Sequence, residues 1–317
     1  MSIMKTQQIL RSLTAVAVVA VLFTACDKDK ASKKVLNLTA INNSKSQVVN
    51  VKFKSTQKSM ESKPMEEKTF PIGCRQMLST TFDAQNKTFG YMACDNTYRI
   101  MDVETGVAKK QFSLPESISM VVVDAIRNVL IGRYYVSGTD KDNGTDHVLI
   151  INLNDGSIIS DKQFYVGGFW NSTYFFRDIE NEYVLLKSDN VLVFVNPSTG
   201  NIIKTLNLDT EIYNGIYDRK NNRLIGATFT SGTDKFNGTV HIVTVDLNTG
   251  KTLSKVVAQG INSIGGEERD YDAETNSYVL ITNNTEVLFV DVATGNVNER
   301  YQLDFDITSL KVWRNNK

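Results

Sequence analysis

A five-residue turn that ends in glycine recurs along the chain, and this repeat constrains the fold more than any other feature. The turn begins with Asp or Asn, and successive glycines lie 50, 44, 50 and 45 residues apart. Its copies are Asp102–Gly106 (DVETG), Asn152–Gly156 (NLNDG), Asn196–Gly200 (NPSTG), Asp246–Gly250 (DLNTG) and Asp291–Gly295 (DVATG). A second turn precedes each copy and begins at Asp83, Asp124, Asp178, Asp218 and Asp272. Because Asp and Asn bond the local backbone and Gly accepts positive φ, both turns predict a structural role within an array of similar units.

Between the turns lie short runs rich in Val, Ile, Leu, Phe and Tyr. Examples are Val148–Leu153, Tyr183–Lys187, Val191–Val195, His241–Leu247 and Val287–Val292. No stretch after the N-terminal segment shows a sustained helical period. Each unit therefore predicts four antiparallel strands, A to D, with the Asp turn between A and B and the Gly turn between C and D. Four strands in about 45 residues are typical of a β-propeller blade, so the predicted fold class is all-β.

The count of units predicts six blades. Five are complete: Cys74–Leu114, Ile118–Val166, Phe169–Leu208, Tyr213–Gly260 and Ile261–Leu303. The remaining pieces are Ile307–Arg314, which looks like a lone A strand, and three strands near Val35–Ile41, Gln47–Phe53 and Lys68–Ile72. Together they predict a sixth blade closed by the C-terminal strand, which removes the unpaired edges of an open array. Five or seven blades are the alternatives.

A longer period of two blades is also present. Ser137–Thr145 (SGTDKDNGT) and Ser231–Thr239 (SGTDKFNGT) are nearly identical and lie 94 residues apart, as do Asp124 and Asp218. Blades with a short and with a long B–C hairpin are therefore expected to alternate. A two-blade unit favours an even number of blades.

Two segments carry a resemblance to a known family. Asn190–Leu208 (NVLVFVNPSTGNIIKTLNL) and Thr285–Leu303 (TEVLFVDVATGNVNERYQL) resemble the YVTN-type and quinoprotein-like propeller repeats of secreted bacterial proteins. The resemblance covers most of the chain after the N-terminal segment. It implies the propeller fold and leaves the activity open, because such repeats serve as scaffolds for unrelated functions.

The N-terminal segment predicts export and lipid attachment. Lys5 and Arg11 precede Leu13–Ala25, an apolar run of signal-peptide length, which ends at Cys26. The sequence around Cys26 (LFTAC) resembles the lipobox of bacterial lipoproteins, although Phe23 stands where Leu is usual. The resemblance implies a lipidated (palmitate-bearing) Cys26 and a Gram-negative outer-membrane location. A plain signal peptide cleaved near Ala25 and an uncleaved anchor are the alternatives.

Three regions follow from this interpretation. Residues 1–25 are the signal peptide, residues 26–34 a charged tether, and residues 35–317 the propeller domain. The tether lacks an apolar period and is expected to stay solvated. The membrane leaflet stays open at this stage.

Composition excludes several function classes. The chain has 35 basic and 35 acidic side chains and no long basic run, which argues against nucleic acid as a partner. Two His and three Cys leave few ligands for a metal, so neither metal nor cofactor is expected. Cys74 and Cys94 are the thiols left after lipidation. If Asp83 faces Thr88, a regular ladder places Cys74 opposite Thr97, about three residues from Cys94, so a disulfide and buried free thiols both stay open.

Seven polar or aromatic residues near the starts of A strands are the candidate ligand site at the channel mouth. They are Arg75, Trp170, Asn171, Tyr213, Asn214, Asn262 and Thr308. An aromatic ring beside amides suits a sugar or another small polar ligand. Ordinary propeller packing is the alternative explanation for the same residues.

The tips of the twin hairpins are the candidate contacts to a partner protein. They carry Asp140, Asp142 and Asn143 in one copy, and Asp234, Phe236 and Asn237 in the other. The oxygen-bearing side chains resemble a calcium loop only faintly, because Phe236 replaces Asp142 and no bidentate Glu follows. A Gly-rich hairpin tip explains them more simply.

These observations predict a lipid-anchored extracytoplasmic propeller that binds a small polar ligand or an envelope protein. One alternative is an extracytoplasmic enzyme, either a lactonase-like hydrolase or a quinoprotein-like dehydrogenase. The sequence contains two Trp and no Trp-rich repeat, which disfavours the dehydrogenase. It also lacks a recognisable catalytic motif, so no catalytic residue is predicted. Another alternative is a structural partner in an outer-membrane assembly.

Overall fold

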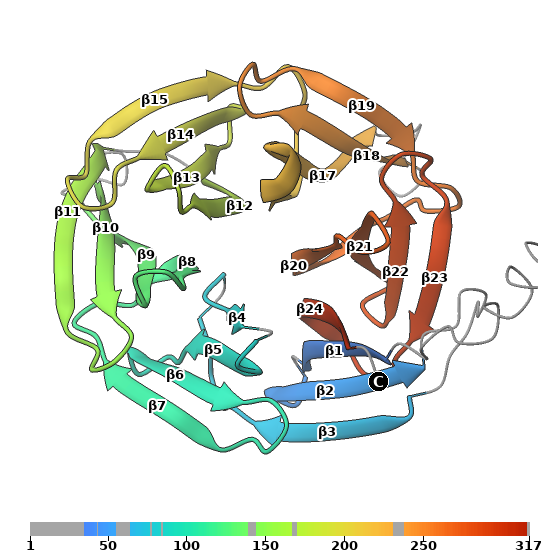
Figure 1. The fold of residues 1–317 in the computed structure, drawn as a ribbon, viewed down its shortest axis with the longest axis horizontal. Helices are drawn as coiled ribbons and strands as arrows, with labels where there is room; N and C mark the ends of the chain where they lie inside the picture. Colours follow the sequence, from blue (N-terminus) through green and yellow to red (C-terminus); the bar gives the residue numbers. More distant parts are fainter. Residues whose placement is uncertain are drawn as a thin grey trace, which may run out of the picture.

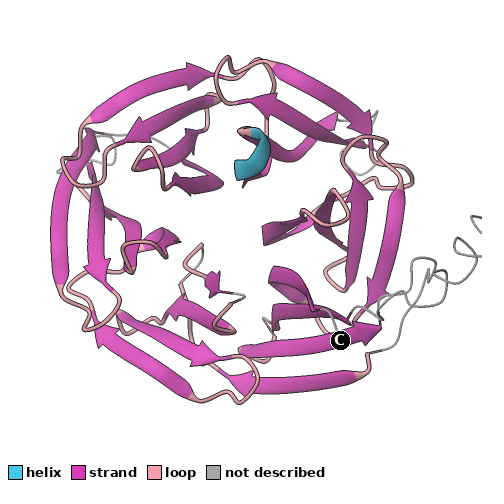
Figure 2. Ribbon diagram, in the orientation of Figure 1, coloured by secondary structure: helices cyan, strands magenta, loops and turns pink. Residues whose placement is uncertain are grey.

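The chain folds into a ring of six antiparallel sheets with four strands each (Figure 1). The computed structural model describes residues 35–42, 44–54, 64–76, 78–83, 85–138, 144–166, 170–230 and 238–315. Within them, strands and turns account for nearly all residues, and Figure 2 shows one short 3₁₀ helix, η1 (Arg219–Asn221). The prediction of an all-β propeller with six blades is confirmed.

Each blade runs from strand A beside the central axis to strand D at the rim. Blade 1 comprises β4 (Thr81–Asp83), β5 (Thr88–Met92), β6 (Thr97–Asp102) and β7 (Ala108–Ser113). Blade 2 comprises β8 (Ser119–Asp124), β9 (Val129–Val136), β10 (Thr145–Asn152) and β11 (Ile158–Val166). Blade 3 comprises β12 (Trp170–Arg177), β13 (Glu182–Lys187), β14 (Val191–Val195) and β15 (Ile202–Asn207). Blade 4 comprises β16 (Tyr213–Asp218), β17 (Arg223–Thr230), β18 (Thr239–Asp246) and β19 (Thr252–Val257). Blade 5 comprises β20 (Gly265–Asp272), β21 (Ser277–Thr282), β22 (Glu286–Asp291) and β23 (Val297–Gln302). Blade 6 comprises β24 (Ile307–Asn315), β1 (Val35–Asn42), β2 (Gln47–Lys54) and β3 (Glu66–Pro71).

The two blade types alternate around the ring. The B and C strands are eight residues long in blades 2, 4 and 6, and five or six residues long in blades 1, 3 and 5. The expected alternation is therefore present in the inner strands.

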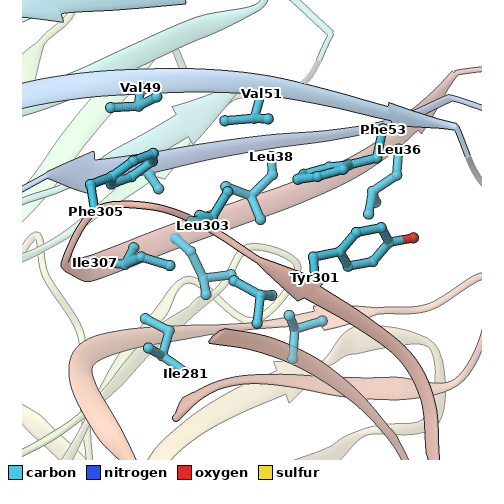
Figure 3. Close-up of a cluster of buried hydrophobic side chains, with 14 of the residues drawn as sticks. Leu36, Leu38, Val49, Val51, Phe53, Ile281, Tyr301, Leu303, Phe305 and Ile307 are labelled. Atoms are coloured by element: carbon cyan, nitrogen blue, oxygen red, sulfur yellow. The ribbon is translucent and has the colours of Figure 1, made fainter. Parts of the chain in front are cut away.

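The ring is closed by the two ends of the domain. β24 pairs antiparallel with β1, from Val35 opposite Asn315 to Ala40 opposite Leu310. Figure 3 shows side chains of β1 and β2 packed against Tyr301, Leu303 and Ile281 of blade 5. The C-terminal strand therefore supplies the A strand of blade 6, as the leftover segments predicted.

The hydrophobic core consists of six layers, each shared by two neighbouring blades in the described part of the chain. Alternation along β13 illustrates why. Tyr183 and Leu185 pack toward blade 2, whereas Val184 and Leu186 pack toward blade 4. Because successive strand side chains point to opposite faces, a strand buried on both faces is a continuous apolar run.

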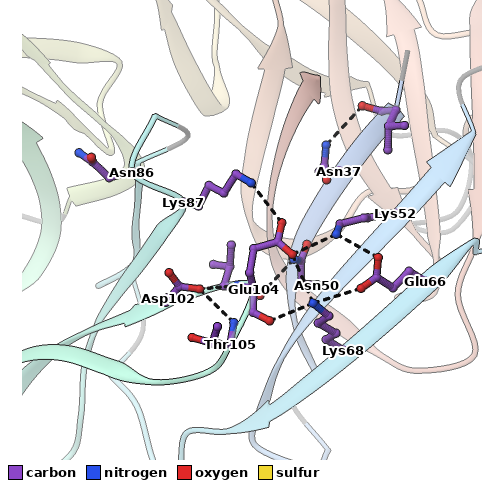
Figure 4. A network of polar contacts seen from close by, with 12 residues as sticks. Asn37, Asn50, Lys52, Glu66, Lys68, Asn86, Lys87, Asp102, Glu104 and Thr105 are labelled. Atoms are coloured by element: carbon purple, nitrogen blue, oxygen red, sulfur yellow. Dashed lines mark hydrogen bonds and ion pairs between the residues drawn. The ribbon is translucent and has the colours of Figure 1, made fainter. Parts of the chain in front are cut away.

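The Asp and Gly turns have the structural role that the sequence predicted. In the first Gly turn, Asp102 Oδ1 accepts the N–H groups of Glu104 at 2.8 Å and Thr105 at 3.0 Å. The same turn joins blade 1 to blade 6, because Glu104 lies within 3.0 Å of Lys52 and 3.3 Å of Lys68 (Figure 4). The Gly turn of one blade thus contacts the rim of the preceding blade.

The two faces of the ring differ in their connections. We call the face with the A–B and C–D turns the turn face, and the face with the D–A connections and B–C hairpins the mouth face. Because β1 takes the place of a B strand, Val35 lies at the turn face beside Asn315. Within the described residues, no helix combines the length and apolar character that crossing a bilayer requires.

Candidate ligand-binding channel

The six A strands surround a cavity of about 490 Å³ on the axis of the ring. Every blade contributes to its wall, with Val121, Val122 and Val123 forming an apolar stretch in blade 2. The polar and charged lining side chains are Thr80, Thr81, Ser172, Tyr174, Asn214, Tyr217, Arg269, Asp270 and Lys311. A partly apolar cavity with a few convergent polar groups is the usual form of a small-molecule site.

Irregular pairing of the A strands shapes this wall. The register shifts along β8, β12, β16 and β20 where each pairs with its B strand. Met120 and Asn214 lie in two of these shifts and adopt φ of 52° and 50°. Tyr183 of the next blade donates to Met120 O at 2.5 Å, and Tyr278 donates to Asn214 O at 2.9 Å. These tyrosines satisfy the carbonyls that the bulges expose, and bulges are often found beside functional sites.

A polar group joins blades 3 and 4 at the cavity. Ser172 Oγ donates to Asn214 Oδ1 at 2.5 Å, and Gly215 N–H donates to Thr173 Oγ1 at 2.7 Å. Asn171 Nδ2 donates to Ile212 O at 3.0 Å. The hydroxyl of Ser172 is therefore held in a fixed position at the wall of the cavity.

Charged groups come from blades 5 and 6. The carboxylate of Asp270 accepts N–H groups from Val312 at 2.7 Å and from Tyr271 at 2.9 Å. Burial raises the pKa of Asp270 above its usual range, opposed by the positive charge of Lys311 and by these backbone N–H groups. Lys311 Nζ donates to Arg269 O at 3.4 Å. Asp270 thus fastens β20 to β24 while it faces the cavity.

Of the residues predicted for the channel mouth, Asn214 lines the cavity, and the other six are not among its lining residues. Arg75 Nη2 donates to Thr308 Oγ1 at 2.9 Å, so blades 1 and 6 meet there. Trp170 Nε1 donates to buried Asp146 at 2.8 Å, and the Arg133 guanidinium lies 5.9 Å from the Trp170 ring.

The remaining members of the predicted set are more exposed. Tyr213 is 39% exposed and donates to Glu211, an interaction that raises the pKa of Tyr213 to about 12, with burial adding to it. Asn262 is exposed, and Asn171 lies at the junction of blades 3 and 4. Ligand binding by these residues stays a prediction.

A disulfide lies at the mouth of blade 1. Cys74 and Cys94 are bonded, with Cα atoms 5.4 Å apart. The expectation that Cys74 falls opposite Thr97 was wrong. Asp83 does face Thr88, but Arg75 faces Ala93, so the register shifts by three residues between the two pairs. The irregular segment before β4 absorbs the offset and brings the two cysteines together.

Other predicted site residues lie outside the described residues. These are Cys26 with its signal peptide and tether, and the loop-tip residues Asp140, Asp142, Asn143, Asp234, Phe236 and Asn237. Among the described residues, no group of three or more His, Cys, Asp or Glu side chains is arranged to hold a metal ion.

Most of the cavity wall was not predicted from the sequence. The unpredicted lining residues lie further along the A strands than the predicted ones; they are Ser172, Tyr174, Tyr217, Arg269, Asp270 and Lys311. Alternation along each A strand points to some of them. The register shifts, however, change which side chains face the axis.

Similarity to known proteins is found among solved structures. No family model and no curated protein matches the chain. Among solved structures, it is similar to "Dihydro-heme d1 dehydrogenase NirN in complex with DHE", with a TM-score of 0.48 and 12% sequence identity. The match covers 84% of this chain and 63% of the other, so this chain spans less than two thirds of that neighbour's length. The six blades and their closure rest on the strand pairing of this chain, which is a six-bladed β-propeller.

Proposed function

We propose that the protein is a lipid-anchored extracytoplasmic binding module whose channel takes up a small polar ligand. The observation that carries this proposal is the cavity of about 490 Å³, to which all six A strands contribute. Ser172 and Asn214 offer hydrogen-bonding groups, Tyr174 and Tyr217 offer aromatic rings, and Lys311 offers a positive charge. The lipobox-like sequence at Cys26 supports the anchor.

Binding explains the channel better than acid–base catalysis. Asp270 is the carboxylate among the described lining residues, and both of its oxygens accept backbone N–H groups. Hydrolysis by a pair of carboxyl groups needs a second Asp or Glu beside the first, and no second one lines the described part of the cavity. The side chains of Glu267 and Glu268, in β20, lie outside the described part.

The test is calorimetric titration of the purified protein with monosaccharides, amino acids and small carboxylates. A ligand of the channel should bind the Ser172→Ala variant about threefold to tenfold more weakly, because a lost neutral hydrogen bond costs about 0.5–1.5 kcal/mol. It should bind the Lys311→Ala variant at least about tenfold more weakly, because a lost hydrogen bond to a charged group costs about 1.5–3 kcal/mol. Lys251→Ala is the matched control, since this lysine is 73% exposed on the turn face and does not line the cavity. Equal affinity in all variants contradicts a channel site.

An envelope protein is the second candidate ligand, and the nearly identical sequences of Ser137–Thr145 and Ser231–Thr239 favour it. A pull-down from detergent-solubilised envelopes separates the two. Recovery of one stoichiometric membrane protein, with no small molecule bound in calorimetry, supports a structural partner in an outer-membrane assembly.

A further inference from the structure

Exposed aliphatic side chains gather on the turn face. Of the thirteen large hydrophobic side chains that are exposed in the described part of the chain, nine lie at or just after an A–B or C–D turn. Six of them represent six turns of blades 1 to 4: Val107, Ile126, Ile158, Ile179, Ile202 and Leu253. We call these six the aliphatic cluster. Single exposed hydrophobic residues are ordinary, but concentration on one face marks an interaction surface.

The two most exposed members lie in neighbouring turns that contact each other. Ile179 is 76% exposed and Ile126 is 71% exposed, each in an A–B turn. Their turns touch, because Arg127 Nη1 donates to Asp178 O at 3.5 Å. Ser160 Oγ donates to Ser198 O at 3.4 Å, which joins β11 to the C–D turn of blade 3. The turns of blades 2 and 3 that carry members of the aliphatic cluster are therefore in contact with each other.

The charges around these two isoleucines are largely paired. Arg127 contacts Asp124 at 2.6 Å, and Arg219 contacts Asp178 at 2.8 Å. Glu180 contacts Arg177 at 2.8 Å. This part of the turn face therefore presents exposed aliphatic side chains among charges that largely cancel, which suits an uncharged partner better than a strongly charged one.

The chain enters the propeller on this same face. Val35 begins β1 beside Asn315, at the position that the A–B turn occupies in the other blades. The nine residue steps from Cys26 to Val35 span at most about 30 Å. The eight residues of β1 rise about 26 Å toward the mouth face. A lipid on Cys26 thus reaches the turn face directly, whereas the mouth face lies nearly the whole tether length beyond Val35.

We infer that the turn face docks on the lipid bilayer, with Ile126 and Ile179 inserted at its surface and the channel mouth turned away from the membrane. This inference rests on the proposed lipid anchor at Cys26. Aliphatic side chains that are buried at the membrane surface add to the binding free energy that the acyl chains supply. The occupant of the aliphatic cluster is therefore the membrane that carries the anchor.

The test places an environment-sensitive dye on each face of the lipid-modified protein in phosphatidylcholine vesicles. One variant is Ile179→Cys on the turn face, and the matched control is Val136→Cys, which is 44% exposed at the mouth face. Cys74 and Cys94 are bonded to each other, so the dye reacts with the introduced thiol. A quencher attached to the lipid chains should reduce the emission several-fold at position 179 and leave position 136 unchanged.

A second measurement separates docking from the anchor. A dye at Leu253→Cys should lose its quenching in the Ile126→Ser/Ile179→Ser background and keep it in the Val136→Ser/Val257→Ser background. Quenching that persists at high salt is expected, because apolar contacts are not screened. Vesicles that also contain the anionic lipid phosphatidylglycerol should give the same quenching as vesicles of phosphatidylcholine alone.

Each outcome decides between the proposals. If the quencher reduces the emission equally at positions 179 and 136 in a protein that floats with the vesicles, docking is overturned and the anchor is retained. Absence of acyl groups on Cys26 by mass spectrometry, or failure to float, overturns both the anchor and the docking.

Discussion

A missing side chain decides how closely neighbouring blades approach each other. Gly250 has a φ of 72°, and a Cβ there would lie 2.1 Å from Asn207 O on the rim strand of blade 3. Gly260 has nearly the same φ, 74°, but no atom lies within 4 Å of a Cβ built on it. The two glycines therefore separate the effect of backbone conformation from the effect of close approach.

Replacing these glycines by alanine should give unequal losses. Gly260→Ala should lower the free energy of unfolding by about 1 kcal/mol, the cost of left-handed backbone for a residue with a Cβ. Gly250→Ala should lower it by about 2–4 kcal/mol, because backbone atoms must also move to relieve the clash. Urea unfolding of both variants measures the difference, and equal losses would show that blade packing tolerates the extra methyl group.

At the scale of elements, Asp and Asn make the same turn with different electrostatics. Asn196 Oδ1 accepts the N–H groups of Ser198 and Thr199 at 3.0 and 3.2 Å, as Asp102 does for its own turn. Asp102 also contacts Lys109 at 2.9 Å. The hydrogen bond from Lys109 lowers the pKa of Asp102 to about 2, burial opposes it, and the backbone N–H groups add to the lowering.

This difference predicts a pH-dependent effect of Asp102→Asn. The pKa of Asp102 is lower in the folded state, so its stabilisation is fully present above about pH 4 and is lost as the pH falls toward about 2. At neutral pH the variant should lose less than about 1 kcal/mol, since exposed ion pairs contribute little. Urea unfolding across this range should show the two proteins converging at the acid end; a constant difference contradicts the ion pair.

The irregular start of blade 1 depends on its disulfide. The bond closes a sequence separation of 20 residues, for which loop-closure entropy predicts about 3 kcal/mol of stabilisation. The Cys74→Ala/Cys94→Ala variant should unfold with a free energy lower by about that amount. Dithiothreitol should destabilise the parent protein equally and leave the variant unchanged. Sensitivity of the variant to dithiothreitol would point to another reducible group.

At the scale of the whole molecule, the ring is held shut by buried charge as well as by β24. Arg314, at the end of β24, contacts Asp272 and Glu299 of blade 5, each at 2.7 Å, and all three side chains are less than 10% exposed. Burial disfavours the charge of Arg314, but the two carboxylates outweigh it and raise its pKa. Removal of the cation would leave two buried carboxylates without their partner.

Arg314→Leu should therefore lower the free energy of unfolding by about 3 kcal/mol. Arg300→Leu is the control, because Arg300 pairs with Glu286 at 2.5 Å but is 42% exposed, and its loss should cost less than about 1 kcal/mol. Chemical denaturation compares the two. Equal effects would mean that the last strand is held by its hydrophobic contacts alone.

The blades could be predicted from the sequence, because turn chemistry and strand alternation are local. An Asp that bonds its own backbone, a Gly at positive φ and a run such as Tyr183–Leu186 each act within a few residues. Four strands in a period near 45 residues are then typical of a propeller. The leftover strands at both ends followed from the same count. Strand β13 does not show the alternation of polar and apolar residues, because both of its faces are buried. Its sequence is a continuous apolar run, which does not tell which residue faces which neighbouring blade.

Tertiary structure alone decided the channel. Register shifts in the A strands set which side chains face the axis. A shift of the same kind places Cys74 opposite Cys94, where a regular ladder would place Thr97. Lys311 and Ser172 meet in one cavity only because β24 closes a ring of six blades. Such long-range geometry accumulates over the whole chain, and no local pattern of residues encodes it.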